Sequence, residues 1–99
     1  MMLEEALDQV DRLGDDKVIF ARRPWTLDTE AEIVMLNVKF RNVDAIRNRD
    51  LEYFLEVSVA QEVLEVFGDR EPTVEQTRAL LLFYAEHDAY PDWVYDETR

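Results

Sequence analysis

The only histidine, His87, stands beside acidic residues and is the first place where chemistry could occur. Asp88 follows it directly and Asp92 lies four residues further on. Imidazole and carboxylate groups are common ligands of divalent metals, but this spacing matches no established metal motif. A lone histidine near acids at a helix end is more often structural. We therefore predict no metal site and no cofactor, and we keep a metal-binding or hydrolytic protein built on these three residues as the least favoured alternative.

Other catalytic arrangements have little support in the sequence. The chain has no cysteine, which excludes a thiolate nucleophile and a disulfide framework. Ser58, the one serine, falls in an expected strand without a nucleophile elbow, and no glycine-rich loop could cradle a phosphate. The 23 carboxylates could include an acid–base pair, but a raised pKa cannot be read from sequence. We predict that the protein is not an enzyme.

Two aromatic stretches with charged neighbours are better candidates for a binding surface. Residues 22–25 (RRPW) end in Trp25, and residues 85–93 (AEHDAYPDW) contain Tyr90 and Trp93. Trp, Tyr and Arg are the side chains that most often anchor protein interfaces. The alternative is that the two tryptophans cover the ends of the core, which we prefer for Trp93, whereas Tyr90 is expected to be exposed. The predicted binding residues are Trp25, Glu52, Glu56, Asp88, Tyr90 and Asp92.

The net charge of the chain is strongly negative. The sequence has 23 acidic and 11 basic residues, for a net charge of −12. Residues 50–99 hold thirteen acids and three bases, whereas residues 17–49 hold four acids and seven bases. Such a chain repels nucleic acid and anionic membranes and attracts a basic protein, so we predict a basic protein partner, no nucleic acid and no membrane. The alternative is that the acidity serves only solubility.

The totals are typical of one small globular domain, residues 1–99. The hydrophobic fraction of 47% is sufficient for a core. No apolar run approaches the ~18 residues that a membrane-spanning helix needs. The N-terminal stretch MMLEEALDQVD is acidic and amphipathic, unlike a secretory signal. We therefore expect a cytoplasmic protein.

The stretch from Leu51 to Phe67 changes its hydrophobic period, and the expected fold depends on it. Up to Val59 apolar residues occupy every odd position, which is typical of a strand with one buried face. From Ala60 the spacing of apolar residues becomes helical. We expect a strand over 51–59 that runs directly into a helix over 60–67. The alternative is one continuous helix over 51–67, which would place acids on its apolar side.

Similar patterns predict the remaining elements. We expect a helix over 3–13, strands over 17–22 and 32–40, a polar connection over 41–50, and a helix over 74–87. A capping box of Thr73 and Gln76 should begin the last helix. Both glycines and all three prolines fall between these elements. The predicted fold class is α+β, a small three-stranded antiparallel sheet with helices packed on one face, in the order α-β-β-β-α-α.

Three pieces of the chain resemble a known family. Residues 22–32 (RRPWTLDTEAE), 51–65 (LEYFLEVSVAQEVLE) and 84–93 (YAEHDAYPDW) resemble a family of small acidic bacterial proteins. That family has no assigned enzymatic activity and is similar in size and charge to the immunity proteins that accompany secreted polymorphic toxins. The resemblance implies a bacterial protein that acts by binding, and it implies no role for any single residue.

Our first hypothesis is a non-catalytic protein-binding module, an immunity-type protein that occludes a basic, nuclease-like toxin domain. Nuclease toxins are the natural basic candidates because their sites bind phosphate. The second hypothesis is a small regulatory or adaptor domain with another partner. Self-association through an exposed sheet edge would favour this second hypothesis.

Self-repulsion among the excess acids should lower the stability of the fold at low ionic strength. Raising sodium chloride from about 10 to about 150 mM should therefore raise the melting temperature by screening. Circular dichroism during heating would measure it. A melting temperature that stays flat or falls over this range would show that repulsion does not dominate.

Overall fold

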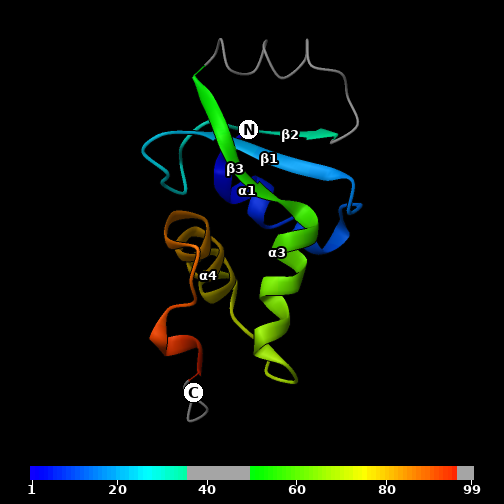
Figure 1. The fold of residues 1–99 in the computed structure, drawn as a ribbon, viewed down its shortest axis with the longest axis vertical. Helices are drawn as coiled ribbons and strands as arrows, with labels where there is room; N and C mark the ends of the chain where they lie inside the picture. The colour runs from blue at the N-terminus through cyan, green and yellow to red at the C-terminus, as the bar shows by residue number, and fades with distance from the viewer. Residues whose placement is uncertain (36–49, 96–99) are drawn as a thin grey trace.

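The computed structural model describes residues 1–35 and 50–95, and it has the predicted α+β architecture (Figure 1). The elements in chain order are α1 (Leu3–Leu7), η1 (Val10–Arg12), β1 (Lys17–Arg22), β2 (Ala31–Met35), β3 (Leu51–Glu56), α3 (Val57–Leu64), η2 (Glu65–Phe67), α4 (Val74–His87) and η3 (Asp92–Tyr95), where η marks a 3₁₀ helix. The strands form an antiparallel sheet in the order β2-β1-β3. Residues 36–40 of the second predicted strand and the connection over 41–49 lie outside the described residues.

The helices cover one face of the sheet, as predicted (Figure 1). Ile19 and Ala21 of β1 point into this layer and are fully buried. They meet Leu7 of α1, Ala60 of α3 and Leu80 of α4, each no more than 1% exposed. The main core therefore lies between the central strand and three helices that come from both ends of the chain.

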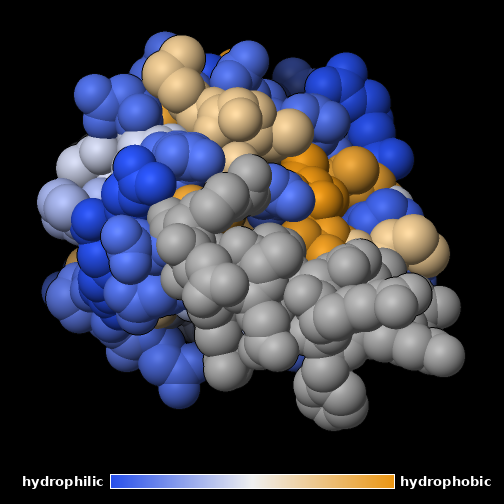
Figure 2. Space-filling model, turned by 90° about the horizontal axis from the view of Figure 1, so that it is seen from above, coloured by the Kyte–Doolittle hydropathy of each residue, from blue (hydrophilic) through white to orange (hydrophobic). Residues whose placement is uncertain are grey.

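A second, smaller apolar cluster lies on the other face of the sheet. It consists of the buried Val18, Phe20 and Leu51, with Val34 packed against them. Figure 2 looks onto this side and shows apolar side chains bordered by hydrophilic ones. The strands therefore carry apolar residues on both faces, which a strictly alternating pattern does not predict.

A β-bulge in β3 explains this distribution. Ile19 pairs with Leu55 and the next residue, Phe20, pairs with Tyr53, which leaves Phe54 as an extra residue without a partner in β1. As a result Phe54 and Leu55 both face the main core, and Tyr53 is 51% exposed. The prediction that every odd position of this strand is buried is therefore wrong at Tyr53, because the bulge reverses the alternation after it.

The change from strand to helix is confirmed, but it occurs three residues earlier than predicted. Glu56 has extended backbone angles and Val57 begins α3, so the strand over 51–59 was predicted too long. The reason is that Val57, Ala60 and Val63 are spaced by three, so Val57 fits a helical stripe as well as a strand. All three are buried in the main core. The alternative of one continuous helix over 51–67 is wrong.

The first predicted helix is divided in two. The apolar residues Leu3, Leu7 and Val10 are buried as expected, but α1 ends at Leu7 and a separate 3₁₀ turn follows. The Gln61 side chain of α3 donates hydrogen bonds to the carbonyls of Val10 and Leu13, at 2.9 and 3.0 Å. Because α3 supplies hydrogen-bond donors to these two carbonyls, they do not require partners within a continuous α-helix over residues 3–13.

The C-terminal part confirms one prediction and adds an element. α4 has the predicted bounds, and both hydrogen bonds of the capping box between Thr73 and Gln76 are present. The 3₁₀ helix η3 was not predicted, and it brings Val94 into the main core with no exposed surface. No helix in the described ranges is long and apolar enough to cross a membrane.

The bulge predicts which of two neighbouring aromatic residues stabilises the fold. Phe54→Ala should lower the free energy of unfolding by about 3–5 kcal/mol, because it opens a cavity in the core. Tyr53→Ala is the matched control and should cost less than about 1 kcal/mol, because half of that side chain is already exposed. Urea denaturation would measure both. Equal costs, or the reverse order, would contradict the bulge.

Candidate functional site

Trp25 lies at the edge of the core instead of projecting from it. Its ring packs edge-on against Phe54, with 4.8 Å between the ring centroids, and its Nε1 donates to the Ala21 carbonyl at 3.2 Å. The Arg23 guanidinium covers the indole at 3.7 Å from the ring centroid. This geometry fits the alternative in which Trp25 closes one end of the core.

Arg23 joins three elements at this place. It forms a 2.7 Å ion pair with Glu86 of α4 and a longer contact of 3.9 Å with Glu52 of β3. Both acids remain substantially exposed, with side-chain exposures of 41% and 61%. We call Arg23, Trp25, Glu52 and Glu86 the Arg23 cluster. The sequence had not indicated Arg23 as a site residue, although it is what brings Trp25 and Glu52 together.

The bulge separates the two predicted binding acids of β3. Glu52 pairs with Ala21, which faces the helices, whereas Glu56 pairs with Val18 on the opposite face. Glu56 accepts a 3.1 Å hydrogen bond from the Tyr53 hydroxyl. Partial burial, followed by the nearby Glu56 carboxylate, raises the pKa of Tyr53 above its usual 10.0. Glu52 and Glu56 therefore cannot contact one partner from the same face of the sheet.

Asp88 and Asp92 lie at the C-terminal end of α4 and are both exposed. Asp88 ends the helix in the left-handed conformation, with φ 54°, and its N–H donates to the Tyr84 carbonyl at 2.7 Å. Aspartate is one of the residues that tolerate this conformation. Asp92 begins η3 and completes the turn around Pro91. The two carboxylates therefore stand close in the chain on a surface turn.

The exposure of the aromatic residues in this turn differs from the prediction, which had Tyr90 exposed and Trp93 covering the core. Tyr90 is half-buried, with its ring 5.5 Å from that of Tyr84 and 6.3 Å from that of Tyr95. Burial, then the neighbouring phenols and the acids Glu62 of α3 and Glu65 of η2, raises the pKa of Tyr90. Trp93 and Tyr95 are the exposed rings, at 39% and 61%. The reason is that η3 folds back onto the core, which brings Tyr90 inward and turns Trp93 outward.

These residues belong to the end of α4 and the segment through η3, and we call them the C-terminal patch. It contains Glu86, Asp88, Tyr90, Asp92, Trp93 and Tyr95. Glu86 also belongs to the Arg23 cluster, so Trp25 and Glu52 adjoin this patch. Of the six predicted binding residues, Trp25 and Glu52 lie together in the Arg23 cluster, and Glu56 lies on the far face of the sheet.

His87 has no metal-binding arrangement around it in the described structure. It is exposed, and its ring lies 4.4 Å from that of Phe83, one turn earlier in α4. Within residues 1–35 and 50–95, no group of three or more His, Cys, Asp or Glu side chains is arranged to hold a metal ion.

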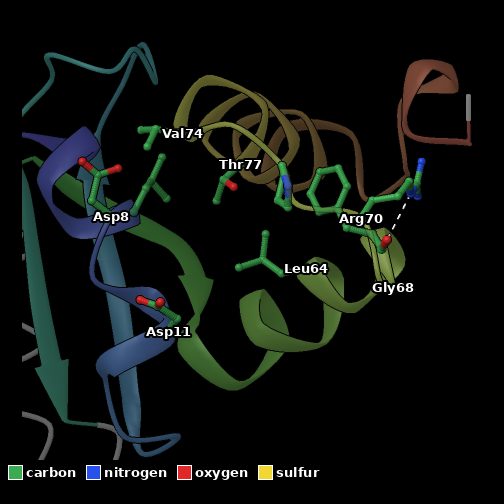
Figure 3. Close-up of a pocket in the computed structure, with 10 residues that line it drawn as sticks. Asp8, Asp11, Leu64, Gly68, Arg70, Val74 and Thr77 are labelled. Atoms are coloured by element: carbon green, nitrogen blue, oxygen red, sulfur yellow. Dashed lines mark hydrogen bonds between the residues drawn. The ribbon is translucent and has the colours of Figure 1, made fainter. Parts of the chain in front are cut away.

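A second surface, which the sequence did not indicate, surrounds the first turns of α4. It begins as a hollow of about 460 Å³ between α1, η1, α3 and α4 (Figure 3). A second hollow of about 330 Å³ shares Phe67, Arg70 and Pro72 with the first, and a third of about 320 Å³ shares Gln76 and Trp93 with the second. Val74 and Thr77 line the first hollow and Gln76 and Ala79 the third, so the hollows lie on different faces of α4. Together we call them the α4 trough. Trp93 belongs to both surfaces.

An ion-pair network at one end of the trough holds α4 against α1. The Arg78 guanidinium donates to both Asp8 oxygens, at 2.9 and 2.6 Å, and lies 3.3 Å from Glu4. The hydrogen bonds from Arg78 hold the pKa of Asp8 below its usual 3.8. Bidentate pairs of this kind have a fixed geometry, which makes them more effective than single exposed contacts.

The lowered pKa of Asp8 predicts a pH-dependent contribution to stability. A depressed carboxyl pKa stabilises the folded state above pH 3.8, and this contribution is lost as the pH falls through the folded-state pKa. Asp8→Asn should therefore lower the urea midpoint at pH 7 and have a much smaller effect near about pH 2.

Asp11→Asn is the matched control, because Asp11 lines the same hollow and has no ion pair with any described residue. It should leave the midpoint nearly unchanged at both pH values. A deficit of Asp8→Asn that is equal at both pH values would contradict the pair's role.

Comparison of the chain with protein-family models, with curated proteins and with solved structures gave no match. Two surfaces of the described residues are candidates for a binding site. The first is the C-terminal patch, which combines exposed acids with exposed aromatic rings. The second is the α4 trough, which meets that patch at Trp93.

Proposed function

We propose that the protein is a non-catalytic, cytoplasmic binding module that occludes a basic protein domain. The specific form of the proposal is an immunity-type protein that blocks a nuclease-like toxin. Blocking would be steric and electrostatic, and no bond would be made or broken.

The observation that carries this proposal is the composition of the C-terminal patch. Within residues 86–95 the acids Asp88 and Asp92 are exposed, and so are the rings of Trp93 and Tyr95. Aromatic side chains are the usual anchors of interfaces, and carboxylates next to them select for a cationic partner. A partner lysine or arginine could pair with an acid here and stack on a ring in the same contact.

The overall charge of the chain also supports a basic partner. A net charge of −12 raises the association rate with a basic surface and disfavours contact with nucleic acid. A nuclease has to carry positive charge where it binds phosphate, so it presents the complementary surface. Covering that surface would exclude the nucleic acid from the active site by both charge and bulk.

A second candidate is a regulatory or adaptor domain that associates with itself. The observation that favours it is the position of β3, which pairs with β1 on one side and has no second strand beside it in the described part of the sheet. An edge strand of this kind offers backbone donors and acceptors to another chain. Light scattering would separate the two functions, because this candidate requires a dimer and the first does not.

The test of the first proposal is co-expression with the product of the neighbouring gene. That product alone should arrest growth, and co-expression with this chain should restore it. The purified complex should dissociate as salt rises, because the contact is largely ionic. A harmless neighbour, together with no basic protein retained by the tagged chain, would count against the proposal.

A charge reversal in the patch sharpens this test. Asp92→Lys should weaken the complex by about tenfold or more, because it places a cation against a basic partner. Asp15→Lys makes the same charge change at an exposed residue of the turn before β1 and should have a smaller effect. Equal effects of the two variants would mean that the patch is not the binding surface.

A further inference from the structure

We infer that the third hollow, where Trp93 meets the first turns of α4, receives an arginine side chain of the protein partner, stacked on the indole and paired with Glu75. The inference rests on the proposed function, since it assumes a basic protein partner. It adds which basic side chain docks and where it docks, at an acid that lies outside the C-terminal patch.

The lining of the third hollow combines an aromatic ring, a carboxylate and a small side chain. The described residues that border it are Glu75, Gln76 and Ala79 of α4 and Trp93 of η3. Glu75 and Ala79 are exposed, and the indole of Trp93 is 39% exposed. At about 320 Å³ the hollow is at the lower end of the range of ligand pockets, about 300–1,000 Å³. Its size and lining therefore suit one long side chain better than a whole segment of a partner.

The carboxylate of this hollow is available for a cation. Glu75 forms no ion pair with any other described residue. Arg78, one turn further along α4, interacts electrostatically with Glu75, but its guanidinium donates to both oxygens of Asp8, at 2.9 and 2.6 Å. The side-chain oxygen of Gln76 already accepts from the Thr73 N–H at 2.9 Å in the capping box. Glu75 therefore supplies the acceptor that a docked cation would use.

The chain already forms this arrangement once, with its own Arg23. The Arg23 guanidinium lies 3.7 Å from the centroid of the Trp25 indole and forms a 2.7 Å ion pair with Glu86 of α4. Glu75 and Glu86 are eleven positions apart in α4, which places them about three turns apart on the same side of the helix. The helix thus presents a glutamate at each of two indoles. Arg23 occupies the first site, and no described arginine or lysine borders the third hollow.

Arginine matches this hollow better than lysine does. A guanidinium is planar, so it can stack on an indole while its edge donates two hydrogen bonds to a carboxylate. A lysine ammonium is a compact, strongly hydrated point charge and cannot make both contacts with one planar group. An anionic ligand such as a phosphate would be repelled by Glu75. The occupant that fits the ring and the charge together is therefore an arginine.

An NMR titration of the full chain with three short peptides tests the inference. Each peptide is made of glycine and serine, is blocked at both ends, and has one central residue, which is arginine, lysine or citrulline. Citrulline keeps the planar shape of arginine without its charge. The arginine peptide should shift the indole N–H signal of Trp93 with a Kd of about 1 mM. The lysine peptide should bind about threefold more weakly, and the citrulline peptide should not saturate.

The signal of Trp25 and three variants control this titration. The Trp25 indole N–H donates to the Ala21 carbonyl and should shift little. Glu75→Gln keeps the shape of the side chain, removes its charge, and should weaken binding of the arginine peptide by about threefold to fivefold. Asp15→Asn is the matched control, because Asp15 is an exposed acid outside the hollow, and it should have little effect. Ala79→Leu fills the hollow and should abolish saturation.

Folding of these variants is checked by their urea midpoints. Glu75 and Ala79 are exposed positions of α4, so both substitutions should leave the midpoint close to that of the unmodified chain.

Four outcomes would overturn the inference. Equal binding of the arginine and citrulline peptides would mean that the hollow does not recognise charge. Equal binding of the arginine and lysine peptides would mean a site for any cation instead of an arginine site. Equal losses in Glu75→Gln and Asp15→Asn would remove Glu75 as the partner of the cation, and unchanged binding in Ala79→Leu would place the peptide elsewhere.

The same variants separate this inference from the proposed function. If the protein partner keeps its affinity for Ala79→Leu but loses affinity for Asp92→Lys, the arginine site is wrong and the proposed function stands. If the arginine peptide binds beside Trp93 but the chain retains no basic protein, the proposed function fails and the arginine site stands.

Discussion

The packing of Phe54 into the core is the contact on which the arrangement of the surfaces depends. Phe54 is the extra residue of the bulge in β3, and its ring meets Trp25 while the strand continues to pair with β1. If the strand had no bulge, Phe54 would pair with Ile19, and Leu55 would pair with Val18 and point to the far face of the sheet. The bulge therefore determines which face the helices cover and on which face each acid of β3 lies.

Charge acts on this fold in two different ways. Two arginines join segments that are far apart in the chain. Arg78 binds Glu4 of α1 and Asp8 directly after it, and Arg23 binds Glu86 of α4 and contacts Glu52. Acids outnumber bases by more than two to one, so the arginines and lysines cannot balance all of the acids. The unbalanced acids are what makes a basic partner the best match to this surface.

In the C-terminal patch and the α4 trough, acidic side chains occur together with aromatic or apolar ones. Acidic side chains alone attract any cation, and an aromatic or apolar surface alone attracts many proteins. Side by side they select a partner with both properties, because the apolar contacts supply affinity and the charges supply the rate and the orientation. Trp93 lies where the two surfaces meet, with one side against Phe67 and part of its ring exposed.

The sequence by itself determined the fold class, the bounds of β1 and α4, the capping box and the existence of a strand that becomes a helix. These depend on local periodicity and on hydrogen bonds between residues close in the chain. The tertiary structure decided where that strand ends, because Val57 fits both periods and only the core selects one. It also decided the division of the first helix, through Gln61, and the 3₁₀ turn that buries Val94.

The candidate site follows the same division. The sequence identified most of the acids and one ring of the C-terminal patch, because residues 86–95 are close in the chain and rich in acids and aromatics. It placed Glu52 and Glu56 together, and only the bulge separates them. The contacts of Arg23 and the α4 trough could not be found from sequence, since they join segments tens of residues apart. Composition is a property of the chain, whereas the face on which a side chain lies depends on strand pairing and on packing between distant elements.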